Sequence, residues 1–169
     1  MRTLKALATA TLFATIAGPV AAGDAPMDVS HGVQLGQAFD PSNAVEVTTS
    51  MLNQDKLYQV DAAPNPHGQD LGKIYLSLTP DQNKVYEIWA IRHFNSTQPC
   101  RDLRDNLMDA LKAKYPDAEM KRAMMSMDGR ESLIKGDTKI STGCKTGIGK
   151  ATFYLRHRHI ALHAQVAER

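Results

Sequence analysis

Three histidines near the end of the chain have the type and spacing that could hold a metal ion. Neutral imidazole is a common ligand of zinc and copper. In a β-strand, His157 and His159 project from the same face, and His163 follows four residues later, where a helix is expected to begin. The pattern predicts either a zinc or copper site or a polar strand face without metal, since no neighbouring acidic residue orients the rings. No other cofactor is expected.

Arg156 and Arg158 alternate with these histidines and would project from the opposite face of the same strand. The planar guanidinium group binds carboxylates and phosphates through paired hydrogen bonds, so the two arginines together could form an anion pocket. The alternative is an edge or partner-facing strand. Its charges would then keep the strand soluble and prevent it from pairing with strands of other molecules.

The sequence contains no Gly-x-Ser-x-Gly and no His-Glu-x-x-His pattern. The glycine-rich segment 143–150 lacks the order of a phosphate-binding P-loop, because Ala151 follows Lys150 where a serine or threonine is required. We therefore expect no catalytic residues and favour a protein without enzymatic activity. An unrecognised envelope hydrolase is the alternative, because residues distant in the sequence can meet in the fold.

The first residues have the pattern of a secretory signal peptide. Arg2 and Lys5 precede an apolar run over residues 6–17, and a small-residue pattern ends at Ala22. We expect cleavage after Ala22, export to the periplasm, and a mature chain of residues 23–169 that forms a single domain. The apolar run is shorter than the ~20 residues that span a bilayer, so no transmembrane segment is expected after cleavage.

The charge balance argues against a general nucleic-acid binder. The chain has 20 basic and 18 acidic residues, and two of the basic ones, Arg2 and Lys5, leave with the signal peptide. The mature chain is therefore formally neutral. Proteins that bind nucleic acid or anionic membranes through a general field keep a positive excess, so neither partner is expected.

Cys100 and Cys144 are the only cysteines of the chain. An even number of cysteines in an exported protein indicates a disulfide bond. A pair of free, redox-active thiols is the alternative, but the chain has no Cys-x-x-Cys pattern.

Residues 72–94 have the pattern of a β-hairpin around which the rest of the chain is organised. Two β-favouring runs flank a turn at Pro80 and Asp81. The second run is apolar on both faces, which is typical of a strand inside a sheet. We therefore expect this hairpin at the centre of a sheet, with Trp89 in the core.

The clearest helix follows the hairpin. It is expected to begin at Ser96 or Thr97 and to end at Tyr115, before Pro116. Its apolar positions recur at helical spacing and form one face. They are Cys100, Leu103, Leu107, Ala110 and Leu111. A Cys100–Cys144 bond would thus fasten this helix to a sheet.

The other segments complete an α+β fold, with an antiparallel sheet and helices on one of its faces. A short helix is expected from Asp40 through Val47, and residues 118–127 are ambiguous and rich in methionine. The remaining expected elements are strands at 33–35, 57–60, 131–135, 138–144 and 150–159 and a terminal helix at 160–169. Residues 63–68, which include His67, form a proline-rich loop that could contact a partner.

Three segments resemble small, uncharacterised exported proteins of proteobacteria. They are residues 35–40, 86–90 and 153–156. There is a fainter similarity to the small α+β lipoproteins of outer-membrane assembly, from which this chain departs because it lacks the lipid-attachment cysteine directly after the cleavage site. The resemblance implies a periplasmic location and a fold, and it brings no catalytic residue.

These features together favour a periplasmic, non-enzymatic module that binds an envelope protein or another envelope component. The expected binding residues are Arg156, Arg158 and His67. A metal-binding protein using the three histidines and an envelope hydrolase are the alternatives.

Overall fold

The structure is a computed structural model that describes residues 27, 29–47, 57–61, 70–123 and 128–168. Its helices are η1, a 3-10 helix (Pro41–Asn43), α1 (Thr97–Lys114) and α2 (Ile160–Ala167). The strands are β1 (Val29–Ser30), β2 (Val33–Gln34), β3 (Val45–Val47), β4 (Leu57–Val60), β5 (Lys73–Leu78), β6 (Val85–Phe94), β7 (Glu119–Arg122), β8 (Glu131–Lys135), β9 (Thr138–Gly147) and β10 (Lys150–His159).

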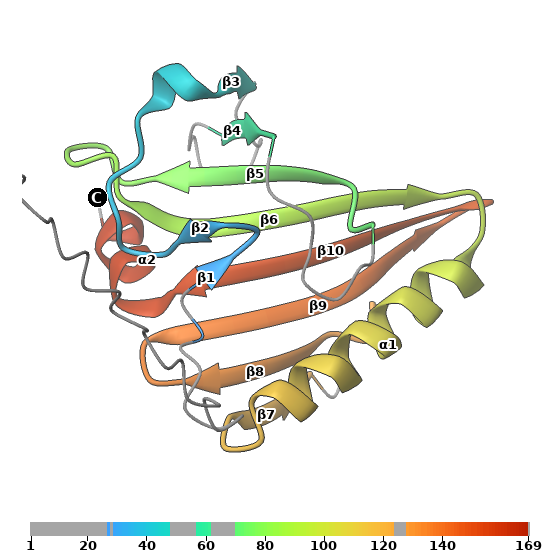
Figure 1. Ribbon diagram of the computed structural model, residues 1–169. Coiled ribbons are helices and arrows are strands. Elements are labelled where there is room, and N and C mark those ends of the chain that lie inside the picture. The colour runs from blue at the N-terminus through green and yellow to red at the C-terminus, as the bar shows by residue number, and fades with distance from the viewer. Residues whose placement is uncertain (1–26, 28, 48–56, 62–69, 124–127, 169) are drawn as a thin grey trace, which may run out of the picture.

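Eight of the described strands form one antiparallel sheet in the order β3-β4-β5-β6-β10-β9-β8-β7. Strands β3 to β6 follow one another from one edge to the middle. Helix α1 then carries the chain to the opposite edge, and β7 to β10 return to the middle, where β10 pairs with β6 (Figure 1). This arrangement confirms the predicted α+β fold and places the β5–β6 hairpin near the centre of the sheet.

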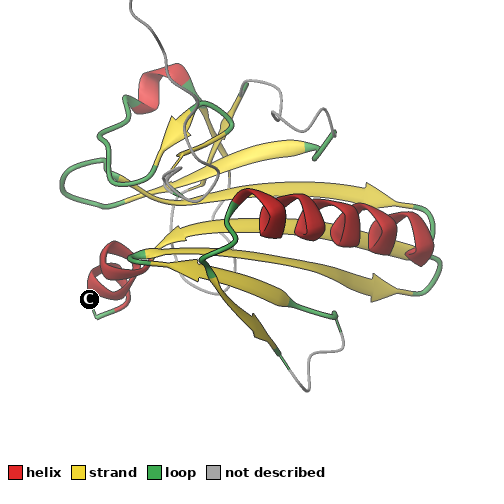
Figure 2. Cartoon of the chain, turned by 60° about the horizontal axis from the view of Figure 1, so that its bottom comes forward, coloured by secondary structure: helices red, strands yellow, loops and turns green. Residues whose placement is uncertain are grey.

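Helix α1 lies along one face of the sheet (Figure 2). It buries Cys100, Leu107, Met108 and Leu111. The helical spacing predicted three of these four, and the other two predicted residues, Leu103 and Ala110, are half-buried. The opposing sheet residues include Ile88, Phe153 and Leu155, all buried in the same apolar cluster. Pro116 follows the end of α1 at Tyr115, as predicted, because proline cannot continue the helical hydrogen bonds.

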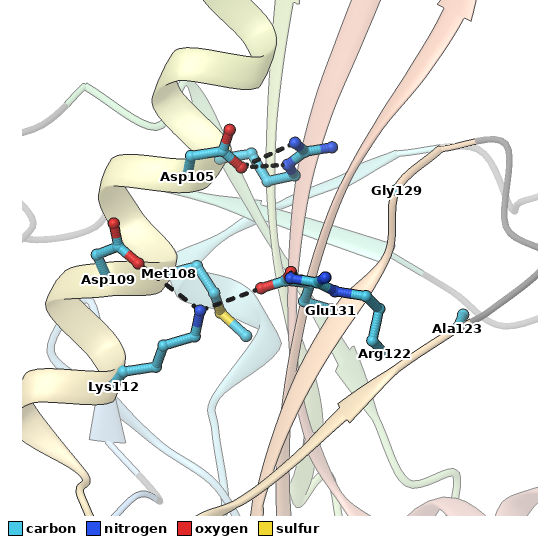
Figure 3. Close-up of a pocket in the computed structure, with 9 residues that line it drawn as sticks. Asp105, Met108, Asp109, Lys112, Arg122, Ala123, Gly129 and Glu131 are labelled. Carbon is cyan, nitrogen blue, oxygen red and sulfur yellow. Dashed lines mark hydrogen bonds and ion pairs between the residues drawn. The ribbon is translucent and has the colours of Figure 1, made fainter.

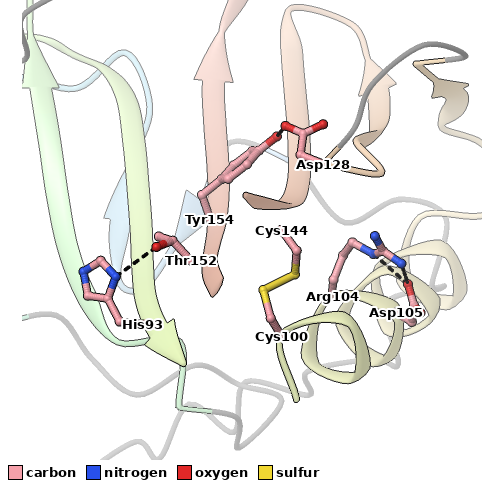
Figure 4. Close-up of a disulfide and its surroundings, with 8 residues drawn as sticks. All are labelled: His93, Cys100, Arg104, Asp105, Asp128, Cys144, Thr152 and Tyr154. Atoms are coloured by element: carbon pink, nitrogen blue, oxygen red, sulfur yellow. Dashed lines mark hydrogen bonds and ion pairs between the residues drawn. A yellow bond between two sulfur atoms is a disulfide. The ribbon is translucent and has the colours of Figure 1, made fainter. Parts of the chain in front are cut away.

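The Cys100–Cys144 disulfide is present, with the two Cα atoms 6.0 Å apart (Figure 4). It joins the first turn of α1 to the middle of β9, and both cysteines are buried. The predicted covalent link between helix and sheet is therefore confirmed.

The segment that contains β1 and β2 covers another part of the same face. Met27 and Leu35 are buried in the apolar cluster. The Nε2 atom of His157, on the same face as Leu155, donates a hydrogen bond to the backbone carbonyl of Met27. Two backbone hydrogen bonds tie Gly36 and Gln37 to Val85 at the start of β6.

The expected helix over residues 40–47 is wrong in its second half. Asp40 accepts a hydrogen bond from the Ser42 amide at 3.0 Å and caps η1, as its position before Pro41 predicted. The helix ends at Asn43, however, and Val45–Val47 form the edge strand β3. The two β-branched valines favour the extended backbone.

The positions of Trp89 and of strand β10 differ from two further predictions. Trp89 is half-buried and does not belong to the apolar cluster, because it projects from the face of the sheet opposite to α1. Strand β10 is not an edge strand, since it pairs with β6 on one side and β9 on the other. The charges of β10 therefore do not serve to block strand pairing.

Candidate functional site

The face of the sheet opposite to α1 carries two rows of side chains that the strand register places side by side. We call this surface the open face, because no described helix or strand covers it. The first row runs across the sheet through Ser77, Glu87, Arg158, Lys139 and Ile134. The second row runs through Tyr75, Trp89, Arg156, Ser141 and Ser132.

Glu87 is the centre of this surface. Its side chain is only 4% exposed, and Arg156 and Arg158 hold its carboxylate. Arg156 donates from Nε and Nη2 to the two carboxylate oxygens at 2.9 and 3.1 Å, and Arg158 donates from Nε at 2.9 Å. A buried carboxylate is stable only with such partners, so Glu87 fixes the position of both arginines.

Trp89 supports the same arrangement. Its indole Nε1 donates to Glu87 Oε2 at 2.8 Å. The guanidinium carbon of Arg156 lies 3.9 Å from the centre of the Trp89 ring, which is a close cation–π contact. Arg156 is thus held by a carboxylate in its plane and by an aromatic ring against its face.

Lys139 of β9 lies beside these arginines on the open face. It is directly opposite Arg158 in the register of β9 and β10. Among the described residues no carboxylate forms an ion pair with Lys139. Burial and the charges of Arg158, Arg130 and Arg156 lower the pKa of Lys139 below its ordinary value of 10.5.

A second polar cluster borders the rows. The Tyr154 hydroxyl donates a hydrogen bond to Asp128 Oδ2, and Arg130 Nε donates to the Tyr154 hydroxyl at 3.0 Å. Figure 4 shows Tyr154 and Asp128 on the side of the sheet away from the disulfide. Burial acts to raise the pKa of Asp128, but the hydrogen bonds from Tyr154 and Arg130 and the charge of Arg130 prevail and lower it below 3.8.

The three histidines proposed as metal ligands have separate structural contacts. His157 is buried and bonds to Met27, while Nδ1 of His159 accepts from the Leu162 amide at 3.5 Å and caps α2. The His163 ring packs edge-on against Tyr86, with 5.9 Å between the ring centres. In the described part of the chain, no group of three histidine, cysteine or acidic side chains is arranged to hold a metal ion.

Ser132 and Lys135 form a Ser-x-x-Lys pattern, which supplies the nucleophile in some serine enzymes. Both lie in β8, where residues three apart project from opposite faces. The Ser132 hydroxyl is within 2.9 Å of the Ser141 hydroxyl, and Lys135 pairs with Asp117 at 3.0 Å. The pattern therefore does not form a nucleophile and base pair.

A cleft of about 550 Å³ lies on the other side of the molecule, between α1 and strands β7 and β8 (Figure 3). Lys112 and Arg122 both bind Glu131, at 3.4 Å from Nζ and 2.9 Å from Nε, and Arg104 pairs with Asp105. Burial opposes the ionisation of Glu131, but Arg122 and Lys112 prevail and lower its pKa below 4.5. The charged residues of this cleft already neutralise one another.

Sequence reasoning identified Arg156 and Arg158 but not Glu87, Trp89 or Lys139. The only signal available for Glu87 was an acidic residue inside an otherwise apolar strand. Its partners lie 69 and 71 residues away, so the pairing depends on strand order. His67, the third expected binding residue, lies outside the described residues.

Comparison of the chain with known protein families, curated proteins and solved structures gave no match. The resemblance to exported proteobacterial proteins therefore stays a prediction. No helix among the described residues is long and apolar enough to cross a membrane.

Proposed function

We propose that this chain is a non-enzymatic binding module of the periplasm that engages an anionic component of the envelope through the open face. The observation that carries the proposal is the group formed by Glu87, Arg156 and Arg158. A carboxylate buried beneath two arginines holds their positions before any ligand arrives, which lowers the entropy cost of binding.

Charge complementarity supports an anionic partner. The open face carries Lys139, Arg156 and Arg158 near its middle, and Glu87 neutralises only one of them. Helix α1 instead carries charges of both signs that lie close together, such as Arg104 beside Asp105 and Lys112 beside Asp109. The middle of the open face therefore has a local excess of positive charge, which attracts anions at short range.

The proposal is tested by measuring retention of the mature chain on washed envelope fractions at increasing salt. Lys139→Glu reverses one charge on the open face, and Arg101→Glu reverses one exposed charge on α1. We expect Lys139→Glu to abolish retention and Arg101→Glu to leave it intact, with wild-type retention weakening as salt rises. Equal retention of both variants would contradict the proposal, since net charge is the same in each.

A further inference from the structure

We infer that Lys139, Arg158 and Arg156 form a binding site for a phosphomonoester group on the open face. This inference rests on the proposed function, because it names the anionic group that the surface would recognise. Three features support it: the strand register, the nitrogen atoms without partners among the described residues, and the charge of the site.

The register places two positive charges, Lys139 of β9 and Arg158 of β10, directly opposite each other in the middle of the sheet. Residues so paired have Cβ atoms about 4.5–5.5 Å apart, and like charges at such positions destabilise the sheet. Glu87 compensates Arg158, but among the described residues no acid compensates Lys139. The partial burial of Lys139 adds to this unfavourable arrangement. A bound anion would remove the repulsion.

The site also has hydrogen-bond donors to spare. Arg158 uses Nε for Glu87, and its two terminal nitrogens have no partner among the described residues. Arg156 uses Nε and Nη2, and its Nη1 has no hydrogen-bond partner in the described part of the chain. Together with the ammonium group of Lys139, these donors match the several acceptor oxygens of a phosphate group.

The charge of the site favours a dianion. Three cations and one buried carboxylate leave a formal charge of +2. A phosphomonoester carries between −1.5 and −2 at neutral pH, whereas a carboxylate or a phosphodiester carries −1. A phosphomonoester therefore neutralises the site most completely.

Trp89 provides a local measurement of binding. It is the only tryptophan of the chain and contacts Arg156 directly. Inorganic phosphate titrated into the mature, oxidised protein at low salt should change the Trp89 emission with saturation, and calorimetry should give the same dissociation constant. No saturable change up to roughly 100 mM phosphate would overturn the inference.

Three variants assign the binding to this site. Lys139→Met should weaken phosphate binding about tenfold or more, because a charge-assisted hydrogen bond is lost, and Lys139→Arg should retain it. Lys145→Met, on the same face of β9, should bind within about twofold of wild type. Equal weakening by Lys139→Met and Lys145→Met would overturn the inference in favour of a diffuse charge effect.

Thermal melting separates a binding role of Lys139 from a structural one. If the charge of Lys139 serves ligand binding and not stability, Lys139→Met should melt at a higher temperature than the wild type without phosphate, since a repulsive charge is removed. Phosphate should raise the melting temperature of wild type but not of this variant. A variant that melts below the wild type and still binds phosphate would overturn the inference.

Two kinds of vesicle distinguish the source of the phosphate group. Binding to phosphatidic acid, a monoester, but not to phosphatidylglycerol, a diester, supports a lipid ligand. Phosphate binding without vesicle binding supports a soluble or glycan-borne phosphomonoester. If phosphate binds but Lys139→Glu is still retained on envelope fractions, the proposed function fails while the phosphate site stands. If Lys139→Glu loses retention but the wild type does not bind phosphate, the phosphate site fails while the proposed function stands.

Discussion

Glu87 is the residue on which the open face depends most. In β6 it stands between apolar neighbours, and its side chain is 4% exposed. Two arginines and the Trp89 indole supply the hydrogen bonds that an ionised carboxylate requires at such burial. The same hydrogen bonds orient Arg156 and Arg158. They therefore stabilise the fold and also position the two arginines of the proposed binding surface.

Glu87→Gln should therefore be strongly destabilising. The amide cannot balance two arginines, and removal of one partner from a buried ion pair costs about 3–5 kcal/mol; the partial exposure of the arginines reduces this to about 2–4 kcal/mol. Chemical denaturation would measure the free energy of unfolding. The control is Glu119→Gln, whose pair with Lys121 is exposed and should contribute about 0–1 kcal/mol. Equal effects of the two changes would contradict the role of Glu87.

Tyr154→Phe should change how stability depends on pH. The hydroxyl helps to lower the pKa of Asp128 below 3.8, so its contribution is present above that value and is lost as pH falls through the pKa of the folded state. The variant should be less stable by about 1 kcal/mol at pH 7, and the difference should shrink below pH 4. Urea titrations between pH 2.5 and 7 test this, with Tyr75→Phe on the same face as control. A difference that stays constant over this range would exclude the pairing with Asp128.

At the scale of elements, α1 and the sheet are joined by apolar packing and by one covalent bond. The helical spacing of apolar residues was sufficient to predict α1 and its buried face. The disulfide was predicted from export and from an even cysteine count. Local periodicity could not show that β10 lies beside β6, because that neighbour is set by the return of the chain from the far edge.

The errors of prediction have the same physical origin. Trp89 was expected in the core because β6 is apolar on both faces, yet only one of those faces lies under described elements. Val45 and Val47 follow a genuine helix start, but pairing with β4 decides their conformation. The contacts of the three histidines with Met27, Leu162 and Tyr86 likewise depend on segments that their spacing does not reveal.

Cys144→Ser should lower the melting temperature as much as reduction of the wild type does. The bond closes a loop between residues 44 apart, and the chain-entropy relation gives an upper value of about 4 kcal/mol. Melting curves with and without reductant measure the effect, and Cys100→Ala/Cys144→Ala controls for the lone thiol. If the variant and the reduced wild type melt like the oxidised protein, the bond does not stabilise the fold.

At the scale of the whole molecule, net charge conceals how charge is distributed. Composition gave a formally neutral mature chain, from which no general anionic partner was expected. The fold nevertheless gathers Lys139, Arg156 and Arg158 near the middle of the open face, around the single carboxylate of Glu87. Only the strand register shows this local excess of positive charge, and it is the reason for proposing a small anionic group in place of nucleic acid.

Export is the other expectation at this scale. The exported product should begin at Gly23, and its mass should rise by two hydrogens on reduction. Mass spectrometry of the protein released from the periplasm gives both values together. An intact Met1 in that fraction, or a mass unchanged by reductant, would contradict the expectation.

The most direct test of the account is a titration of the Lys139 side chain, followed by the NMR shift of its Cε carbon and assigned from the spectrum of Lys139→Met. Without phosphate, Lys139 should titrate below 10.5, because it is partly buried and lies among cations. Added phosphate should raise that value, since a bound anion favours the charged ammonium form. A titration curve that phosphate does not move would contradict the claim that the open face holds an anion at Lys139.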